Sequence, residues 1–291
     1  MSTAERADSA PPGRAAESEP SERAAELFAH PGVDWPTLAL LVLMWGGLAA
    51  NLAWAAQGGV DLTQGLAHVL IAVASLNLSF TIWHEAVHGT VFRSEAANHV
   101  VGVLGAWPAW IPYFLIRRGH KLHHEHVNDP ERDPDAWFNE GSILSLPFRY
   151  LGGVARTKRM VEATDPPTWE RRVDTAQALA LLLAFVLVGW LAGPVALILC
   201  WMFPKGIVMW IHAWYVNVLP HRDLPSERFR DTRIFSAPWL ALPTVMHSYH
   251  GVHHAWQTVP WHRYARVFRA KRAFLEQRGT PIRTGLRSPA Q

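Results

Sequence analysis

The histidines of this 291-residue chain are concentrated in clusters whose members lie three or four residues apart. That spacing places side chains on one face of a helix, so each cluster can direct two or three imidazoles at one point. A structural zinc site closes with four ligands, so a set of nine histidines predicts more than one metal ion. The set comprises His84 and His88; His120, His123 and His124; His250, His253 and His254; and His221, which follows Asn217 by four residues.

Metal chemistry in this chain would depend on imidazole rather than on thiolate. The one cysteine, Cys200, lies within an apolar run, so no disulfide framework, thiolate zinc site or iron–sulfur cluster can be assembled. The basic residues form no recognisable nucleic-acid-binding motif, and we therefore expect no nucleic acid as a partner.

Segments without Asp, Glu, Lys or Arg lie next to the histidine clusters and predict an all-α, polytopic membrane protein. A helical span needs about 20 apolar residues, and the charge-free segments 35–60, 62–83, 175–204 and 206–220 supply enough of them. Gly193 and Pro194 favour a break within the segment 175–204, which is too long for a single span. We expect four transmembrane helices in two hairpins, over residues 35–57, 62–83, 175–192 and 195–216.

The segment 96–116 is also charge-free, but its two glycines and its prolines at 108 and 112 make it a poor single span. If it crossed the membrane once, His84 and His120 would lie on opposite faces and could not share a site. We therefore predict a re-entrant or interfacial segment. Residues 234–246 are too few to cross and are also expected to lie in the interface.

The basic residues predict the orientation of the chain. Of the 27 Lys and Arg, 26 lie on the side expected to carry the histidines, so the positive-inside rule places a histidine-rich cap with interfacial helices at the cytoplasmic face. Lys205 is the exception, near the middle of a predicted span. Residues 1–33 mix charges and prolines without an apolar signal, so we expect a disordered tail, followed by a membrane domain over 34–272 and a C-terminal tail over 273–291.

Two other classes of protein fit part of this pattern. Taken alone, His84, Glu85 and His88 form the H-E-x-x-H pattern of zinc proteases, in which the glutamate is the general base. An intramembrane metalloprotease would need one further ligand and would leave two histidine clusters unused. A metal-binding transporter is the second alternative, and it would bind metal without consuming oxygen.

The three boxes, H-E-A-V-H at 84–88, H-K-L-H-H at 120–124 and H-G-V-H-H at 250–254, resemble those of the membrane fatty acid desaturase superfamily. The resemblance covers about residues 35–270 and implies a cytoplasm-facing pair of non-haem irons. By position, the implied metal ligands are His84, His88, His120, His123, His124, His221, His250, His253 and His254, with Asn217 acting through water.

The resemblance also implies the reaction. Such a diiron centre uses O2 as co-substrate and two external electrons to oxidise an unactivated C–H bond of a lipid that enters from the bilayer. Because the chain has no GxGxxG motif or cysteine cluster, the donor would be a separate ferredoxin or cytochrome b5-like protein with its reductase. Outer groups commonly orient metal-bound imidazoles, and the candidates for this role are Glu85, Asp129, Asp133, Asp135 and His247.

These residues do not separate desaturation of a fatty acyl chain from ring hydroxylation of a carotenoid, because both reactions begin by removing a hydrogen. The sequences around 128–135, 217–222 and 249–264 are most similar to the β-carotene hydroxylase branch of the superfamily. That detail slightly favours oxidation of a carotenoid such as β-carotene.

Overall fold

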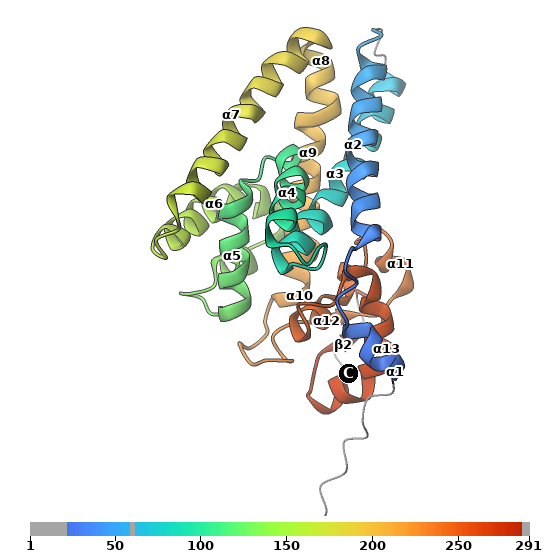
Figure 1. Cartoon of the computed structure of the whole chain (residues 1–291), viewed down its shortest axis with the longest axis vertical. Coiled ribbons are helices and arrows are strands. Elements are labelled where there is room, and N and C mark those ends of the chain that lie inside the picture. The colour runs from blue at the N-terminus through green and yellow to red at the C-terminus, as the bar shows by residue number, and fades with distance from the viewer. Residues whose placement is uncertain (1–21, 59–61, 287–291) are drawn as a thin grey trace, which may run out of the picture.

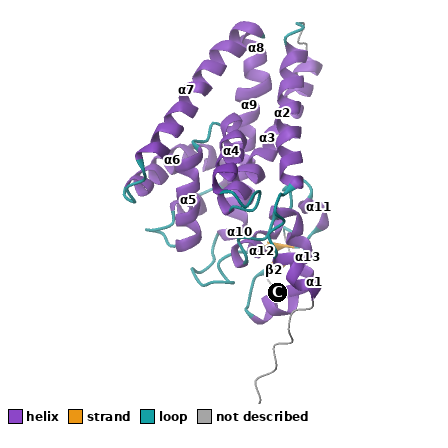
Figure 2. Ribbon diagram, viewed as in Figure 1, coloured by secondary structure: helices purple, strands orange, loops and turns teal. Residues whose placement is uncertain are grey.

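The structure is a computed structural model that describes residues 22–58 and 62–286. The fold is elongated, with long helices in one half and shorter helices and loops in the other (Figure 1). Helices account for most of the described chain (Figure 2). Four of them are long and apolar enough to cross a membrane, which agrees with the predicted number of spans.

The first two long helices are α2 (Trp35–Ala55) and α3 (Leu62–His88), which pack along each other through buried residues such as Met44, Leu48 and Leu76. Pro36 lies in the first turn of α2, where its missing N–H has no helical partner to lose. We predicted that the second span would end at residue 83, but α3 continues to His88. The first histidine box therefore forms the last turns of a long, rigid helix.

The other two long helices are α7 (Thr168–Leu191) and a composite helix that runs from Gly193 to His221. The break at Gly193 has the predicted cause, since its φ of 86° is readily adopted by glycine. The composite helix consists of α8 (Gly193–Leu197), a π-helical turn η4 (Ile198–Met202), α9 (Phe203–His212), a second π-helical turn η5 (Ala213–Val218) and α10 (Leu219–His221).

The segment between the first two histidine boxes bends sharply instead of forming one straight span. It contains α4 (Glu95–Ala106), the short 3-10 helix η1 (Trp107–Ala109) and α5 (Tyr113–His126), and its two halves meet at 101°. Gly105 allows α4 to approach α3 closely, because a Cβ there would lie 3.0 Å from the backbone nitrogen of Trp83. The bend returns α5 to the end of α3.

Most of the remaining elements form a cap around the ends of α3 and α10, whereas α6 lies beside α5 (Figure 1). The largest buried cluster of the cap includes Ile234, Val252 and Tyr264. The elements are α1 (Glu22–Phe28), η2 (Pro134–Asn139), η3 (Ile143–Ser145), α6 (Leu146–Glu162), β1 (Ile234–Phe235), α11 (Pro238–Ala241), η6 (His247–Tyr249), α12 (His250–Ala255), η7 (Trp261–Arg263), α13 (Tyr264–Gln277) and β2 (Ile282–Arg283).

The fold is mostly helical, as predicted, and a small parallel pairing of β1 with β2 joins the segment before the third box to the C-terminal end. Within the predicted N-terminal tail, 1–33, α1 packs against α13. Within the predicted C-terminal tail from 273, α13 continues to Gln277 and is followed by β2. Residues 1–21, 59–61 and 287–291 lie outside the described part of the chain.

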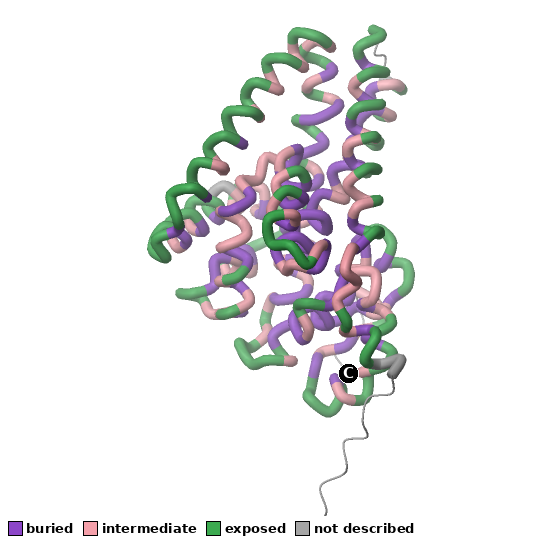
Figure 3. Tube along the Cα trace, in the orientation of Figure 1, coloured by how far each residue is buried: buried purple, intermediate pink, exposed green. Residues whose placement is uncertain are grey.

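Burial divides the molecule as expected for a membrane protein with an internal site (Figure 3). The long helices expose apolar side chains, among them Leu183, Val186 and Trp190 of α7. Trp239 of α11 and Leu242, directly after it, are 61% and 85% exposed, a pattern typical of an interfacial segment. Lys205 is buried within α9, with its Nζ 5.5 Å from the ring centroid of Tyr150.

Candidate metal centre

A first group of five imidazoles converges where α3, α5 and α12 meet. Their potential ligand atoms all lie within 4.8 Å of one another. The distance between Nε2 atoms is 3.1 Å from His84 to His253 and 2.9 Å from His88 to His120. His124 closes the group, with its Nε2 3.0 Å from that of His120 and 2.8 Å from that of His253. We call these five residues cluster one.

A second group of four imidazoles, cluster two, lies beside the first. It contains His123, His221, His250 and His254, whose potential ligand atoms also lie within 4.8 Å of one another. The Nε2 atoms of His250 and His254 are 3.2 Å apart. The two clusters adjoin at His124 and His254, whose ring centroids are 4.4 Å apart. All nine histidines selected from the sequence therefore lie in two adjacent groups.

The second and third boxes each contribute to both clusters. On α5, His120 and His124 point into cluster one while His123 points into cluster two. On α12, His253 belongs to cluster one, and His250 and His254 belong to cluster two. Consecutive helical residues diverge by about 100°, so neighbouring histidines reach different sites.

The donor atoms fit metal ions. Two nitrogen ligands at right angles, each about 2.1 Å from a metal, lie about 3 Å apart, and the Nε2 separations in both clusters fall at 2.8–3.2 Å. Hydrogen bonds alone do not account for this convergence, because a neutral imidazole carries one proton on its two nitrogens. Where Nδ1 carries that proton, the Nε2 lone pairs face one another, and a cation between them would stabilise this arrangement.

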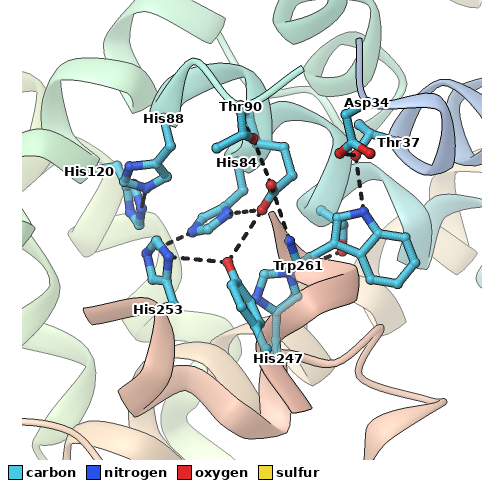
Figure 4. A network of polar contacts seen from close by, with 12 residues as sticks. Asp34, Thr37, His84, His88, Thr90, His120, His247, His253 and Trp261 are labelled. Atoms are coloured by element: carbon cyan, nitrogen blue, oxygen red, sulfur yellow. Dashed lines mark hydrogen bonds and ion pairs between the residues drawn. The ribbon is translucent and has the colours of Figure 1, made fainter. Parts of the chain in front are cut away.

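Outer partners engage the Nδ1 atoms of two histidines in cluster one (Figure 4). Glu85 Oε1 lies 3.3 Å from Nδ1 of His84, and the Tyr264 hydroxyl lies 3.2 Å from Nδ1 of His253. The same hydroxyl donates to Glu85 Oε1 over 3.3 Å. Thr90 Oγ1 and the backbone N–H of Trp261 donate to the other oxygen of Glu85, at 2.6 and 3.3 Å. Such partners fix the tautomer and orientation of a ligand ring.

Asp133 has the corresponding role for cluster two. Its carboxylate oxygens lie 3.0 and 3.1 Å from Nδ1 of His123, and it accepts the backbone N–H groups of Asn128 and Asp135 at 2.8 Å. Asp135 lies 3.8 Å from the same Nδ1 and is hydrogen-bonded to the Asn217 side chain. Burial raises the pKa of Asp135 to about 6, although His123 and the Asn217 hydrogen bond oppose the increase. Asn217 is thus connected to cluster two through Asp135 and His123.

The structure does not bring Asp129 to the histidines. Its carboxylate binds Arg132 through Nε at 2.7 Å and closes the turn by accepting the backbone N–H of Glu131 at 3.0 Å. His247 does lie beside cluster one, with its ring centroid 5.0 Å from that of His84 and its Nε2 3.1 Å from the Thr81 hydroxyl. Of the outer candidates, Asp129 alone forms a surface turn.

Tyr264, Thr90 and Trp261 are the partners that the sequence analysis did not select. No histidine-box spacing points to them, because their contacts with Glu85 depend on how α13 and the preceding loop pack against α3. Trp261 Nε1 also donates to Thr37 at 3.0 Å, and Thr37 donates to the buried Asp34 at 2.6 Å. The network therefore extends to the start of α2 (Figure 4).

Burial keeps the imidazoles of the third box in their metal-binding form. Burial, reinforced by neighbouring imidazoles, holds the pKa of His250, His253 and His254 well below the ordinary value of 6.5. A histidine binds metal through a neutral ring nitrogen. The third box therefore presents neutral ligands at physiological pH. His123 differs, because its burial is outweighed by the neighbouring Asp133 carboxylate, which raises the pKa of His123 to about 9.

These features define a class: a helical, multi-pass membrane protein with two adjacent, all-histidine groups that could each hold a metal ion at one end of its long helices. Comparison with known sequences gives the family. Residues 61–285 match the profile of the fatty acid desaturase family. The chain belongs to that family.

Individual relatives differ in the reactions that their names state. The chain is 29% identical over 186 residues to the dihydrorhizobitoxine desaturase of Bradyrhizobium elkanii, covering 55% of this chain and 52% of the relative. It is 24% identical over 217 residues to the β-carotene 4-ketolase 3 of Haematococcus lacustris, covering 70% of this chain and 62% of the relative. With the zeaxanthin 4-ketolase of Chlamydomonas reinhardtii it shares 32% identity over 113 residues, covering 37% and 24%. The chain thus spans between half and two thirds of the first two relatives.

Proposed function

We propose that this protein is a membrane-bound diiron oxidoreductase that oxidises an unactivated C–H bond of a lipid with O2 and two external electrons. The convergence of nine imidazoles into adjacent groups of five and four carries the proposal. Imidazole is a ligand suited to iron. When bound, the pair of irons would supply the activation of O2 that the reaction needs.

The side chains around the clusters would orient the ligands. Glu85 and Tyr264 hold the rings of His84 and His253 through their Nδ1 atoms, and Asp133 holds that of His123. The cap and the helix ends bury most of these groups, which limits the access of water to the centre. Asn217, linked to Asp135, would support cluster two, which has one histidine fewer than cluster one.

The substrate that we favour is a carotenoid ring rather than a fatty acyl chain. The sequence features of the β-carotene hydroxylase branch support this choice, and so do relatives whose names state that they are carotenoid ketolases. Fatty acyl desaturation is the second candidate, supported by 28% identity over 69 residues to an omega-3 fatty acid desaturase of Caenorhabditis elegans.

The alternative of a zinc protease has less support from the geometry. In that class the glutamate of H-E-x-x-H acts as the general base on metal-bound water. Here Glu85 is buried and is occupied by Nδ1 of His84, Thr90 and Tyr264. A transporter remains distinguishable by experiment, because it would bind metal without consuming oxygen.

We further propose that the cap faces the cytoplasm, where a ferredoxin or a cytochrome b5-like protein with its reductase would supply electrons. The distribution of Lys and Arg along the chain supports this orientation. The exposed arginines of α13, among them Arg266, Arg269 and Arg272, offer a basic surface to an acidic donor.

Product analysis tests the proposed reaction. The protein would be expressed in a host that accumulates β-carotene, with the pigments and the fatty acids separated by chromatography. We expect new hydroxylated or keto carotenoids with the wild type and none with His253→Ala. His126→Ala is the matched control, because His126 lies on α5 outside both clusters. New fatty acid double bonds without new pigments would instead support fatty acyl desaturation.

A further inference from the structure

A cavity of about 120 Å³ lies between the last spanning helix and the segment before the third histidine box. Residues of α9, η5 and α10 line one side, and residues of α11 and η6 line the other. Much of the lining is apolar, including Trp214, Phe235 and Leu240. His247 also lines the cavity, and its ring centroid lies 5.0 Å from that of His84 and 6.3 Å from that of His250. The cavity therefore adjoins both metal clusters.

Three residues that line this cavity each carry a buried polar atom without a hydrogen-bond partner among the described residues. These atoms are the hydroxyl oxygens of Tyr215 and Ser248 and Nδ1 of His247. The three side chains are deeply buried, at 4%, 6% and 1% exposure. Buried polar groups are nearly always paired, so an unpaired group needs an explanation. Three such atoms around one small apolar cavity indicate a ligand that is itself mostly apolar but carries a hydrogen-bonding atom.

We propose that this cavity binds the end group of the substrate and recognises a hydroxyl or carbonyl oxygen on it. This inference rests on the proposed function and specifies its substrate as a lipid that already carries oxygen near the reacting end. The hydroxyls of Tyr215 and Ser248 donate to that oxygen, and Trp214 and Leu240 pack against the carbon skeleton. A hydrocarbon end group leaves these polar atoms unpaired, so it binds more weakly.

The size of the cavity supports an end group rather than a whole lipid. An apolar cavity of about 150 Å³ holds one benzene molecule, so the 120 Å³ found here matches a few methylene groups or part of a ring. The rest of a long substrate would lie outside. Residues 193–221, which supply one wall, are long and apolar enough to span the bilayer, so the remainder of the substrate can stay in the lipid.

A competition experiment with the full-length, metal-loaded protein in membranes tests this inference. β-Carotene, which has no oxygen, and zeaxanthin, whose rings carry hydroxyls, would be supplied together, with plain and hydroxylated fatty acids as a parallel pair. We expect the wild type to consume the oxygenated member of one pair about tenfold faster or more. We expect Tyr215→Phe and Ser248→Ala each to reduce this preference by roughly five- to tenfold, which is the loss of one hydrogen bond.

Two substitutions serve as matched controls because their hydroxyls have partners elsewhere. The Tyr113 hydroxyl lies 3.4 Å from Nδ1 of His99, and Ser75 Oγ donates to the carbonyl of Ile71 at 2.8 Å. Tyr113→Phe and Ser75→Ala should keep the wild-type preference. Binding of each carotenoid to the purified protein, followed by quenching of tryptophan fluorescence, gives a second readout that does not need turnover.

The outcomes are distinguishable. Equal consumption and equal binding of both members of each pair, or an unchanged preference in both Tyr215→Phe and Ser248→Ala, would overturn the inference. A preference confined to the fatty acid pair would support recognition of oxygen by the cavity and would identify the substrate as a fatty acyl lipid. If the metal-loaded wild type oxidised no lipid, the proposed function would fail, whereas the binding data would still decide whether the cavity recognises oxygen.

Discussion

The hydroxyl of Tyr264 lies 3.3 Å from Glu85 Oε1, although 179 residues separate the two in sequence. The same hydroxyl lies 3.2 Å from Nδ1 of His253, and Glu85 lies 3.3 Å from Nδ1 of His84. Two histidines of cluster one, 169 residues apart in sequence, thus share one buried support.

Tyr264→Phe should keep the packing of the ring and remove the only polar atom. Loss of such an outer partner typically lowers metal affinity about 10- to 100-fold, and we expect a decrease of this size for the metal in cluster one. Metal retained in the presence of increasing chelator measures the effect. Tyr113→Phe, which removes a buried hydroxyl distant from both clusters, is the control. Wild-type retention in Tyr264→Phe would show that the contact does not support the ligands.

Asp133 and Asp129 provide a matched pair of aspartates on one loop. Asp133→Asn should weaken metal binding in cluster two and reduce activity about 10- to 100-fold, because the carboxylate partner of His123 is lost. Asp129→Asn should leave metal binding and activity within about twofold of the wild type, because Asp129 binds Arg132 at the surface. Activity and metal content of the two variants would be measured side by side. Equal effects would contradict the assignment of Asp133.

The metal-free protein should lose stability as the pH falls below about 6.5. Burial depresses the pKa of His250, His253 and His254 well below this ordinary value and that of His247 to about 3. The unfolded chain therefore binds protons that the folded chain does not, and the free energy of unfolding decreases on acidification. The raised pKa values of His123 (about 9), Asp135 (about 6) and Asp231 act in the opposite direction, but the four histidines with lowered pKa values outnumber these three groups. Melting temperatures at pH 7.5 and 5.5 would show the effect, and a higher value at pH 5.5 would refute it.

His123→Ala should abolish turnover while membrane insertion stays intact. His123 supplies one of the four imidazoles in cluster two. It lies on α5, and alanine at this position is compatible with the helix. Turnover and recovery in the membrane fraction would be measured, with His126→Ala as the control on the same helix. Wild-type activity in His123→Ala would refute the position of this site.

The spacing of the histidines is sufficient to predict which imidazoles come together, but not how they divide between the two clusters. Spacings of three and four placed each box on one helix face, and all nine histidines do converge. The assignment of His123 and His124 to different clusters depends on the exact orientation of α5 relative to α3 and α12. Helix orientation is set by tertiary packing, which the spacing does not contain.

Other features of the site also depend on tertiary structure. The loop sequence offered Asp129, Asp133 and Asp135 as equivalent candidates, and only its folded turn directs Asp133 to His123 and Asp129 to Arg132. Tyr264 becomes a partner of Glu85 only when α13 packs on α3. The π-helical turn η5, which carries Asn217, has no simple sequence signature, and such turns are frequent at functional sites.

The metal content of the purified wild-type protein tests the central claim most directly. Elemental analysis after reconstitution with iron should find about two irons per chain, because the two histidine clusters each fit one ion. Cluster variants such as His88→Ala and His250→Ala should each lower this number towards one. A single zinc per chain, or a metal content that neither variant changes, would contradict the account.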